Sequence, residues 1–303
     1  GAFLGWGIGA NDSGNLFGTA VGSRMVRYRT ATILIAICVI LGAVLQGQHG
    51  IKTVSALSSQ TLNSAVICTI SAACAVTLMS LLRMPVSTSQ ALIGAIVGIG
   101  MIRDNVQWQI LAKVIVCWIA APVTGIVLSW LLYRLFRVVY NHFRPDIFVL
   151  DPLLRSGMII FGCYAAYALG ANASAIVAAV FVGSGEGMVS MRAAALFGGC
   201  AIAVGALTYS HRVMMTIGEG VMSIDTFSAF IGVLALALTI HLFAFIGVPV
   251  SSSQSMIGCL LGIGLVKGLQ VINYKTLRRI AAAWVITPII SAILAMMIYT
   301  AAR

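Results

Sequence analysis

The sequence predicts an all-α polytopic membrane protein made of two inverted repeats. Three observations predict this fold: long apolar stretches, a duplicated motif, and an odd number of membrane segments in each copy. The chain of 303 residues is 60% hydrophobic and 8% charged, whereas an ordinary soluble domain has roughly 25% charged residues. The composition therefore excludes a soluble protein.

One string of sixteen residues occurs twice, as PVSTSQALIGAIVGIG from Pro85 and as PVSSSQSMIGCLLGIG from Pro249, and ten positions are identical. Gly-Ala-Asn at 9–11 recurs at 170–172, and Trp-x-x-x-Pro at 118–122 recurs at 284–288. The chain order of these matches predicts a first repeat over 1–136, a cytoplasmic linker over 137–155 and a second repeat over 156–303. Internal duplication of this kind is frequent in secondary transporters.

Each repeat contains five apolar segments, and an odd number requires the second repeat to be inverted relative to the first. The segments are 1–22, 30–46, 61–82, 86–102 and 109–135, then 156–184, 193–209, 226–247, 250–266 and 279–301. Those that begin at 86 and 250 have only about a dozen apolar residues after a polar start, and 51–57 and 213–221 are interrupted by polar residues. We therefore expect discontinuous or re-entrant helical hairpins, whose free backbone groups must be buried in protein or line a cavity.

The basic residues follow the inverted arrangement. Thirteen of the 18 fall on one side of the predicted membrane: Arg24, Arg27, Arg29, Arg83, Arg134, Arg137, Arg144, Arg155, Arg212, Lys267, Lys275, Arg278 and Arg279. The other five are Lys52, Arg103, Lys113, Arg192 and Arg303. The richer side is predicted to be cytoplasmic, so both termini are expected outside a multi-pass cell-membrane protein. We expect the basic residues to set the orientation of the chain in the membrane, and the linker at 137–155 to contact anionic lipid headgroups. No nucleic-acid partner is expected.

The two Pro-Val-Ser strings are candidate anion sites. Proline suits the first turn of a helix, Ser or Thr caps it, and the N-terminus carries partial positive charge and free N–H donors. Two opposed N-termini can hold an oxyanion without a permanent cation. The candidates are Ser87, Thr88, Ser89 and Gln90 with Ser251, Ser252, Ser253 and Gln254. Alternatively, these small residues permit close helix packing, and their hydroxyls bond to their own turns.

A carboxylate in the first apolar segment is the candidate cation site, because ionisable groups within membrane segments are costly and usually functional. Asp12, Asn11 and Asn15 offer hard oxygen ligands that suit Na⁺, with Asp12 and Asn11 the foremost metal ligands. Asp12 alone can instead take up a proton. A further alternative is a helix cap at the membrane interface.

These motifs resemble those of the inorganic phosphate transporter (PiT) family. GANDSGNLFGTAVGS from Gly9 is similar to that family's GANDVANAFGTSVGS-type motif, and the two PVS strings resemble its paired PVSTT/SH-type segments. The resemblance covers nearly the whole chain and implies symport of inorganic phosphate with Na⁺ or H⁺, with no other cofactor. It places the anion on the two Ser-rich strings and the cation on Asn11, Asp12, Asn15 and Asn172.

Two departures from the family pattern bear on the substrate. The second copy has Ala173 where the first has Asp12, and Gln90 and Gln254 stand where many relatives have His. A branch of the superfamily carries sulfate with protons, so a proton-coupled sulfate permease is an alternative. An uncoupled anion channel is another, since one half lacks the carboxylate.

Enzyme functions are not expected. The serines have no His in a Gly-x-Ser-x-Gly or similar context, and the chain has no Gly-x-x-x-x-Gly-Lys-[Ser/Thr] loop for nucleotide-driven pumping. The sequence leaves the oligomeric state open, a homodimer included.

Overall fold

The computed structural model describes residues 1–81, 86–144, 146–183, 188–220, 225–268 and 274–302. Within these ranges the chain is almost entirely helical, and the few extended residues form a single isolated bridge between Val182 and Val189. The first half contains α1 (Ala2–Gly22), α2 (Tyr28–Leu57), α3 (Leu62–Leu81), α4 (Thr88–Ile102) and α5 (Trp108–Phe143). The second contains α6 (Ile147–Ala178), α7 (Met191–Tyr209), α8 (His211–Gly220), α9 (Thr226–Ile246), α10 (Ser252–Lys267) and α11 (Tyr274–Ala301).

Each of the ten predicted segments contains a helix, and the all-α inverted-repeat fold is confirmed. Seven described helices are long and apolar enough to cross a membrane: α2, α3, α5, α6, α7, α9 and α11. The short apolar helix α4 was expected to fall below this length. The structure thus agrees with a multi-pass membrane protein.

Two details of the predicted segments differ. The interruption expected at 51–57 is absent, because α2 contains no proline and continues as one helix to Leu57. Its counterpart in the second half is divided into α7 and α8 at Ser210, whose hydroxyl donates to the carbonyl of Ala206 (2.6 Å) and lies 3.3 Å from the hydroxyl of Tyr28. The predicted linker at 137–155 is mostly helix, since α5 extends to Phe143 and α6 begins at Ile147; its role as a cytoplasmic linker stays a prediction.

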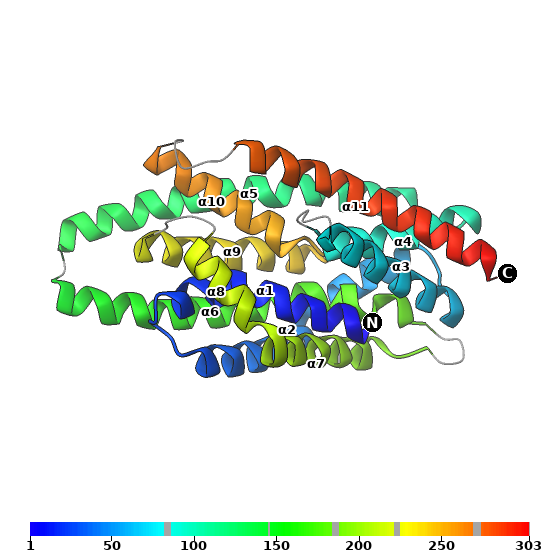
Figure 1. Cartoon of the computed structure of the whole chain (residues 1–303), viewed down its shortest axis with the longest axis horizontal. Coiled ribbons are helices and arrows are strands. Elements are labelled where there is room, and N and C mark those ends of the chain that lie inside the picture. Colours follow the sequence, from blue (N-terminus) through cyan, green and yellow to red (C-terminus); the bar gives the residue numbers. More distant parts are fainter. Residues whose placement is uncertain (82–85, 145, 184–187, 221–224, 269–273, 303) are drawn as a thin grey trace.

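Two helical hairpins enter the molecule from opposite ends (Figure 1). The α3–α4 hairpin comes from the end where both termini lie, and the α9–α10 hairpin comes from the opposite end. Both reach the middle of the long axis, where α4 and α10 begin. This is the re-entrant, inverted arrangement that the sequence predicted.

Polar contacts tie the open base of each hairpin. Lys267 at the end of α10 pairs with Asp225 at the start of α9, with Nζ 2.7 Å from Oδ1. At the opposite base, Asn105 after α4 donates from Nδ2 to the carbonyl of Ser59 before α3 (3.1 Å). In each hairpin a polar contact therefore joins the two arms at the base.

The last helix of each half packs against the hairpin of the other half. In α4 a Cβ on Gly94 would run into the carbonyl oxygen of Pro288 in α11, and in α10 a Cβ on Gly258 would run into that of Pro122 in α5. Glycine here permits direct backbone contact between helices, as in membrane Gly-x-x-x-Gly pairs. As a result, α4 packs against α3 of its own half and α11 of the other half, and α10 packs against α9 of its own half and α5 of the other.

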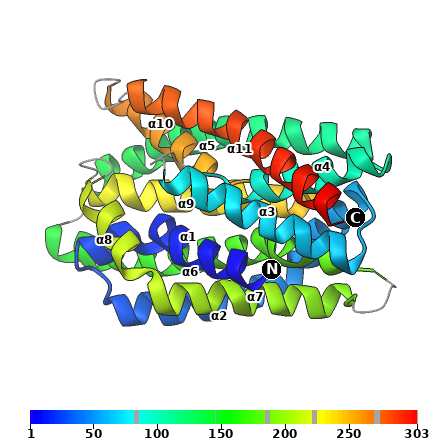
Figure 2. The same ribbon diagram turned by 45° about the vertical axis from the view of Figure 1, so that its right-hand side comes forward.

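The remaining helices α1, α2, α6, α7 and α8 form a bundle beside the hairpins (Figures 1 and 2). Glycines also bring these helices together: a Cβ on Gly170 of α6 would meet the Val39 carbonyl of α2, and one on Gly9 of α1 would meet the Ile202 carbonyl of α7. Arg83, Pro85 and Arg303, which entered the sequence interpretation, lie outside the described residues.

We predict that Gly258→Ala destabilises the protein by about 1–3 kcal/mol, because the added methyl group must push α10 away from the Pro122 carbonyl. Thermal unfolding in detergent measures this effect. Gly7→Ala is the matched control, because a Cβ on Gly7 meets nothing within 4 Å. Equal melting temperatures for the two variants would contradict the prediction.

Candidate functional site

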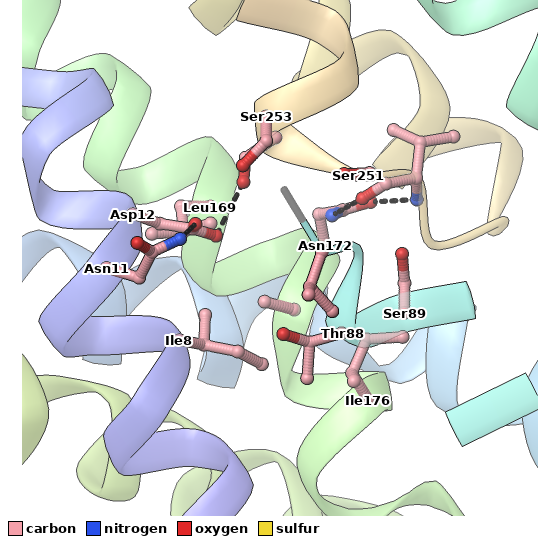
Figure 3. Close-up of a pocket in the computed structure, with 14 residues that line it drawn as sticks. Ile8, Asn11, Asp12, Thr88, Ser89, Leu169, Asn172, Ile176, Ser251 and Ser253 are labelled. Carbon is pink, nitrogen blue, oxygen red and sulfur yellow. Dashed lines mark hydrogen bonds between the residues drawn. The ribbon is translucent and has the colours of Figure 1, made fainter. Parts of the chain in front are cut away.

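The two hairpin tips meet at a small cavity in the middle of the molecule, closed on its other sides by α1 and α6 (Figure 3). Figure 3 shows Asn11 and Asp12 on one side of the cavity and Thr88 and Ser89 on the other. The cavity volume is about 20 Å³, and on this measure a water molecule needs ~10–15 Å³. It is lined by Ile8, Asn11, Asp12, Val86, Thr88, Ser89, Leu169, Asn172, Ala173, Ile176, Val250, Ser251, Ser252 and Ser253.

The first serine of each string caps its helix. The Ser87 hydroxyl accepts from the backbone N–H of Gln90 (3.4 Å), and that of Ser251 accepts from the N–H of Gln254 (3.3 Å). The alternative in which hydroxyls bond to their own turns thus applies to Ser87 and Ser251. Ser251 also lines the cavity, whereas Ser87 does not. The other lining hydroxyls of the two strings are Thr88 and Ser89 on α4, and Ser252 and Ser253 on α10.

Both glutamines lie outside the cavity lining. Gln90 and Gln254 are 3% and 1% exposed, and neither side-chain oxygen accepts a hydrogen bond within the described part of the chain. They occupy equivalent places in the two repeats, in the first turns of α4 and α10. Contact with a bound anion would require each side chain to turn toward the tips.

Asp12 connects the bundle to the second tip. Its Oδ2 accepts a hydrogen bond from the hydroxyl of Ser252 on α10 (2.5 Å), and its Oδ1 accepts from Nδ2 of Asn11 (3.3 Å). The close contact of Gly9 with α7 fixes this turn of α1. Asn15, one turn further along α1, does not line the cavity.

Asn172 holds the backbone of the second tip. Its Nδ2 donates to the carbonyl of Val250 (2.7 Å), and its Oδ1 accepts from the N–H of the same residue (2.9 Å). The side chain is 2% exposed. Both polar ends of the amide therefore contact the hairpin, and Asn172 also lines the cavity. Its implied role as a cation ligand stays a prediction.

The sequence did not identify the cavity residues that lie outside the polar motifs. The apolar wall formed by Ile8, Leu169 and Ile176 carries no sequence signal that separates it from other membrane residues. Trp118 is different, because it belongs to the repeated Trp-x-x-x-Pro pattern. Its indole N–H donates to the carbonyl of Pro249 at the second tip (3.4 Å), a contact between the two halves that the repeat could have suggested.

The cavity is electrostatically simple. Among its lining residues Asp12 is the one ionisable side chain, and no Lys, Arg or His contributes. Hydroxyls and the N-termini of α4 and α10 supply hydrogen-bond donors and partial positive charge. The described residues also contain no group of three or more His, Cys, Asp or Glu that could hold a metal ion. This site suits an oxyanion beside a single carboxylate.

A family model described as "Phosphate transporter family" matches the chain twice, over residues 8–150 and 145–295. The chain belongs to the phosphate transporter family. Members of this family are transporters rather than enzymes, which agrees with a cavity built from caps and hydroxyls.

Two curated relatives differ in the anion that their names give. The chain is 30% identical to the "Putative phosphate permease MJ0630" of Methanocaldococcus jannaschii, over 96% of this chain and 92% of the relative. It is 28% identical to the "Sulfate permease CysP" of Bacillus subtilis, over 95% of this chain and 82% of the relative.

A solved structure described as "The sodium-dependent phosphate transporter" has the same fold. It superimposes with a TM-score of 0.83, covers 99% of this chain and 96% of its own, and is 21% identical. At this identity the likeness shows the fold alone.

We predict that Asn172→Ala lowers the apparent affinity for phosphate about tenfold, because two buried hydrogen bonds to the second tip are lost. Uptake into proteoliposomes as a function of phosphate and of cation concentration measures the effect. A positioning role leaves the cation dependence unchanged, whereas a shift in cation dependence alone would contradict it. Asn63→Ala, at an exposed position of α3 outside the cavity lining, is the matched control, and melting temperatures in detergent identify loss of folding.

Proposed function

We propose that this protein is a secondary active transporter that carries inorganic phosphate across the membrane together with Na⁺ or H⁺. The observation that carries the proposal is the hydrogen bond between Asp12 and Ser252. It joins the one ionisable side chain of the cavity to a hydroxyl at the N-terminus of α10. A cation at Asp12 and an anion at the hairpin tips therefore act on the same hydrogen bond.

Coupling follows from charge. An ionised Asp12 repels an oxyanion a few ångströms away, and this repulsion is strong where water is scarce. The same carboxylate also occupies the Ser252 hydroxyl. Na⁺ or H⁺ at Asp12 removes the net negative charge and frees the hydroxyl to donate to the anion. Cation binding thus favours anion binding, and the reverse holds by linkage.

The cavity must also enlarge during transport. Its present volume of about 20 Å³ admits about one water molecule, so an anion with four oxygens requires the tips of α4 and α10 to separate. The tips belong to hairpins that enter from opposite ends, so movement of each hairpin opens a different side. We infer that the end bearing the termini is external, since the opposite end carries most of the basic residues.

Proton-coupled sulfate transport is the second candidate, favoured by the match to the sulfate permease of Bacillus subtilis. Phosphate at neutral pH retains a proton that it can donate to a carboxylate such as Asp12. Sulfate has no such proton, and it needs Asp12 to be protonated or neutralised. Uptake of each labelled anion under an imposed Na⁺ or H⁺ gradient distinguishes the two.

We predict that Asp12→Asn abolishes accumulation of phosphate driven by a cation gradient and leaves exchange of phosphate across the membrane. Asn is neutral, so it resembles Asp12 with its charge removed and no longer responds to the cation. Counterflow and gradient-driven uptake in proteoliposomes measure the two activities. Asp104→Asn is the control, because Asp104 lies in a loop at a φ of 52° that Asn also tolerates. Cation-driven accumulation that persists in Asp12→Asn would refute the proposed coupling.

A further inference from the structure

Three polar side chains from three helices form a hydrogen-bonded chain away from the cavity. The hydroxyl of Tyr164 on α6 lies 2.6 Å from Nδ1 of His241 on α9, and Nε2 of the same ring lies 2.6 Å from Oε1 of Gln46 on α2. An amide oxygen only accepts, so Nε2 carries the hydrogen, and Nδ1 accepts from Tyr164. Every member of the chain thus has a partner.

None of these three residues lines the cavity, so the proposed transport chemistry does not use them. Polar side chains inside membrane segments are costly unless they are paired, and paired ones hold helices together. The ring of Tyr167 packs edge-on against His241 with centroids 5.7 Å apart. His241 is therefore a fully engaged contact point between α9 and the bundle.

His241 lies on α9, which is the first arm of the hairpin whose tip contains Ser251–Ser253. Tyr164 and Gln46 belong to the bundle helices α6 and α2. Further along the same seam, the rings of Phe161 on α6 and Phe230 on α9 lie 5.1 Å apart. The polar chain and the aromatic contact together join α9 to the bundle at two places along its length.

In the first repeat, the contact between α1 and α3 corresponds to the contact between α6 and α9 in the second. Aligning the repeated motifs places Phe3 at Tyr164, Trp6 at Tyr167, Thr77 at His241 and Thr208 at Gln46. The indole N–H of Trp6 does donate to the hydroxyl of Thr208 (2.9 Å).

No side chain of α3 joins that pair among the described contacts. Thr77 donates to the Ala73 carbonyl of its own helix (2.8 Å), and Phe3 is 61% exposed. The described residues of α3 make only slight contact with α1, whereas α9 packs along α6. Among the described residues, side chains along α9 join its hairpin to the bundle, whereas the α3–α4 hairpin is joined to α2 at its base, where the Ser58 hydroxyl donates to Oδ1 of Asn105 (2.7 Å).

We propose that His241, with Tyr164 and Gln46, is a positioning residue that latches the α9–α10 hairpin onto the bundle. The latch keeps closed the end of the molecule opposite the termini, which carries most of the basic residues. The latch parts when the hairpin moves to open that end, and it re-forms when the hairpin returns. This inference rests on the proposed function, because it assumes that hairpin movement carries phosphate across. It assigns to these residues an effect on which side of the site is accessible.

Tyr164→Phe tests the latch by removing one hydroxyl and keeping the ring. Loss of one such hydrogen bond shifts the balance between latched and released hairpin about fivefold. We expect the apparent KM for phosphate offered at the termini end to rise up to about fivefold, because fewer molecules are open there. The maximal rate is expected to stay the same or to increase. Gln46→Leu, which removes the acceptor at the other end of the chain, should give the same shift.

Tyr167→Phe is the matched control, because its ring touches His241 but its hydroxyl makes no hydrogen bond in the described part of the chain. Hydrogen exchange of the backbone amides of α9 provides a readout that does not depend on transport. Tyr164→Phe should accelerate exchange in α9 and leave α3 unchanged, and Tyr167→Phe should change neither.

The proposal is overturned if Tyr164→Phe and Tyr167→Phe behave alike in KM and in α9 exchange. It is also overturned if Tyr164→Phe lowers only the melting temperature, which is the result of a purely structural contact. Absence of phosphate uptake in the unaltered protein refutes the proposed function instead, and the exchange comparison still decides whether the latch exists.

Discussion

Direct backbone contact between helices of opposite halves is the constraint on which the site depends. Gly94 and Gly258 let α4 and α10 lie against α11 and α5 at distances that any side chain would prevent. These contacts hold two short helices with their N-termini opposed at the centre of the membrane protein. The donor-rich cavity is a consequence of that arrangement, because the first turn of each helix has N–H groups without intrahelical partners.

The two halves have the same fold and different chemistry. The first half supplies the carboxylate of Asp12, and the aligned position of the second half is Ala173. The second half instead supplies Asn172, which binds the Val250 backbone, and His241, which joins α9 to the bundle. One half therefore carries the ionisable side chain of the cavity, while the other carries contacts that position the α9–α10 hairpin. The proposed coupling therefore uses the single carboxylate of Asp12 and does not need a second cation site at Ala173.

Much of this architecture could be predicted from the sequence. The duplicated strings with their prolines and glycines indicated re-entrant hairpins, and the odd number of segments indicated inversion; the structure confirms both. The continuity of α2 through Leu57 could not be predicted, because the polar residues near its end allow either a break or a helix that packing completes. The sequence likewise did not show where α5 ends and α6 begins within 137–155.

The residues of the site could be predicted from the sequence, but not all of their contacts. Residue type and repeat position identified the groups that line the cavity, such as Asp12, Thr88 and Ser252. They did not determine which hydroxyls cap a helix or which face the cavity, because both depend on the first turn of each helix, and Ser251 does both. The partners of Asn172 and His241 are residues far away in the sequence, and a single sequence carries no signal for such pairs.

The central claim is that a cation at Asp12 permits an oxyanion to bind at the hairpin tips. Equilibrium binding of labelled phosphate to the purified protein tests it most directly, measured across Na⁺ concentration at fixed pH and across pH without Na⁺. The account predicts that phosphate affinity rises as Na⁺ increases or as pH falls, because either cation removes the negative charge of Asp12. Phosphate affinity that is independent of both cations would contradict it.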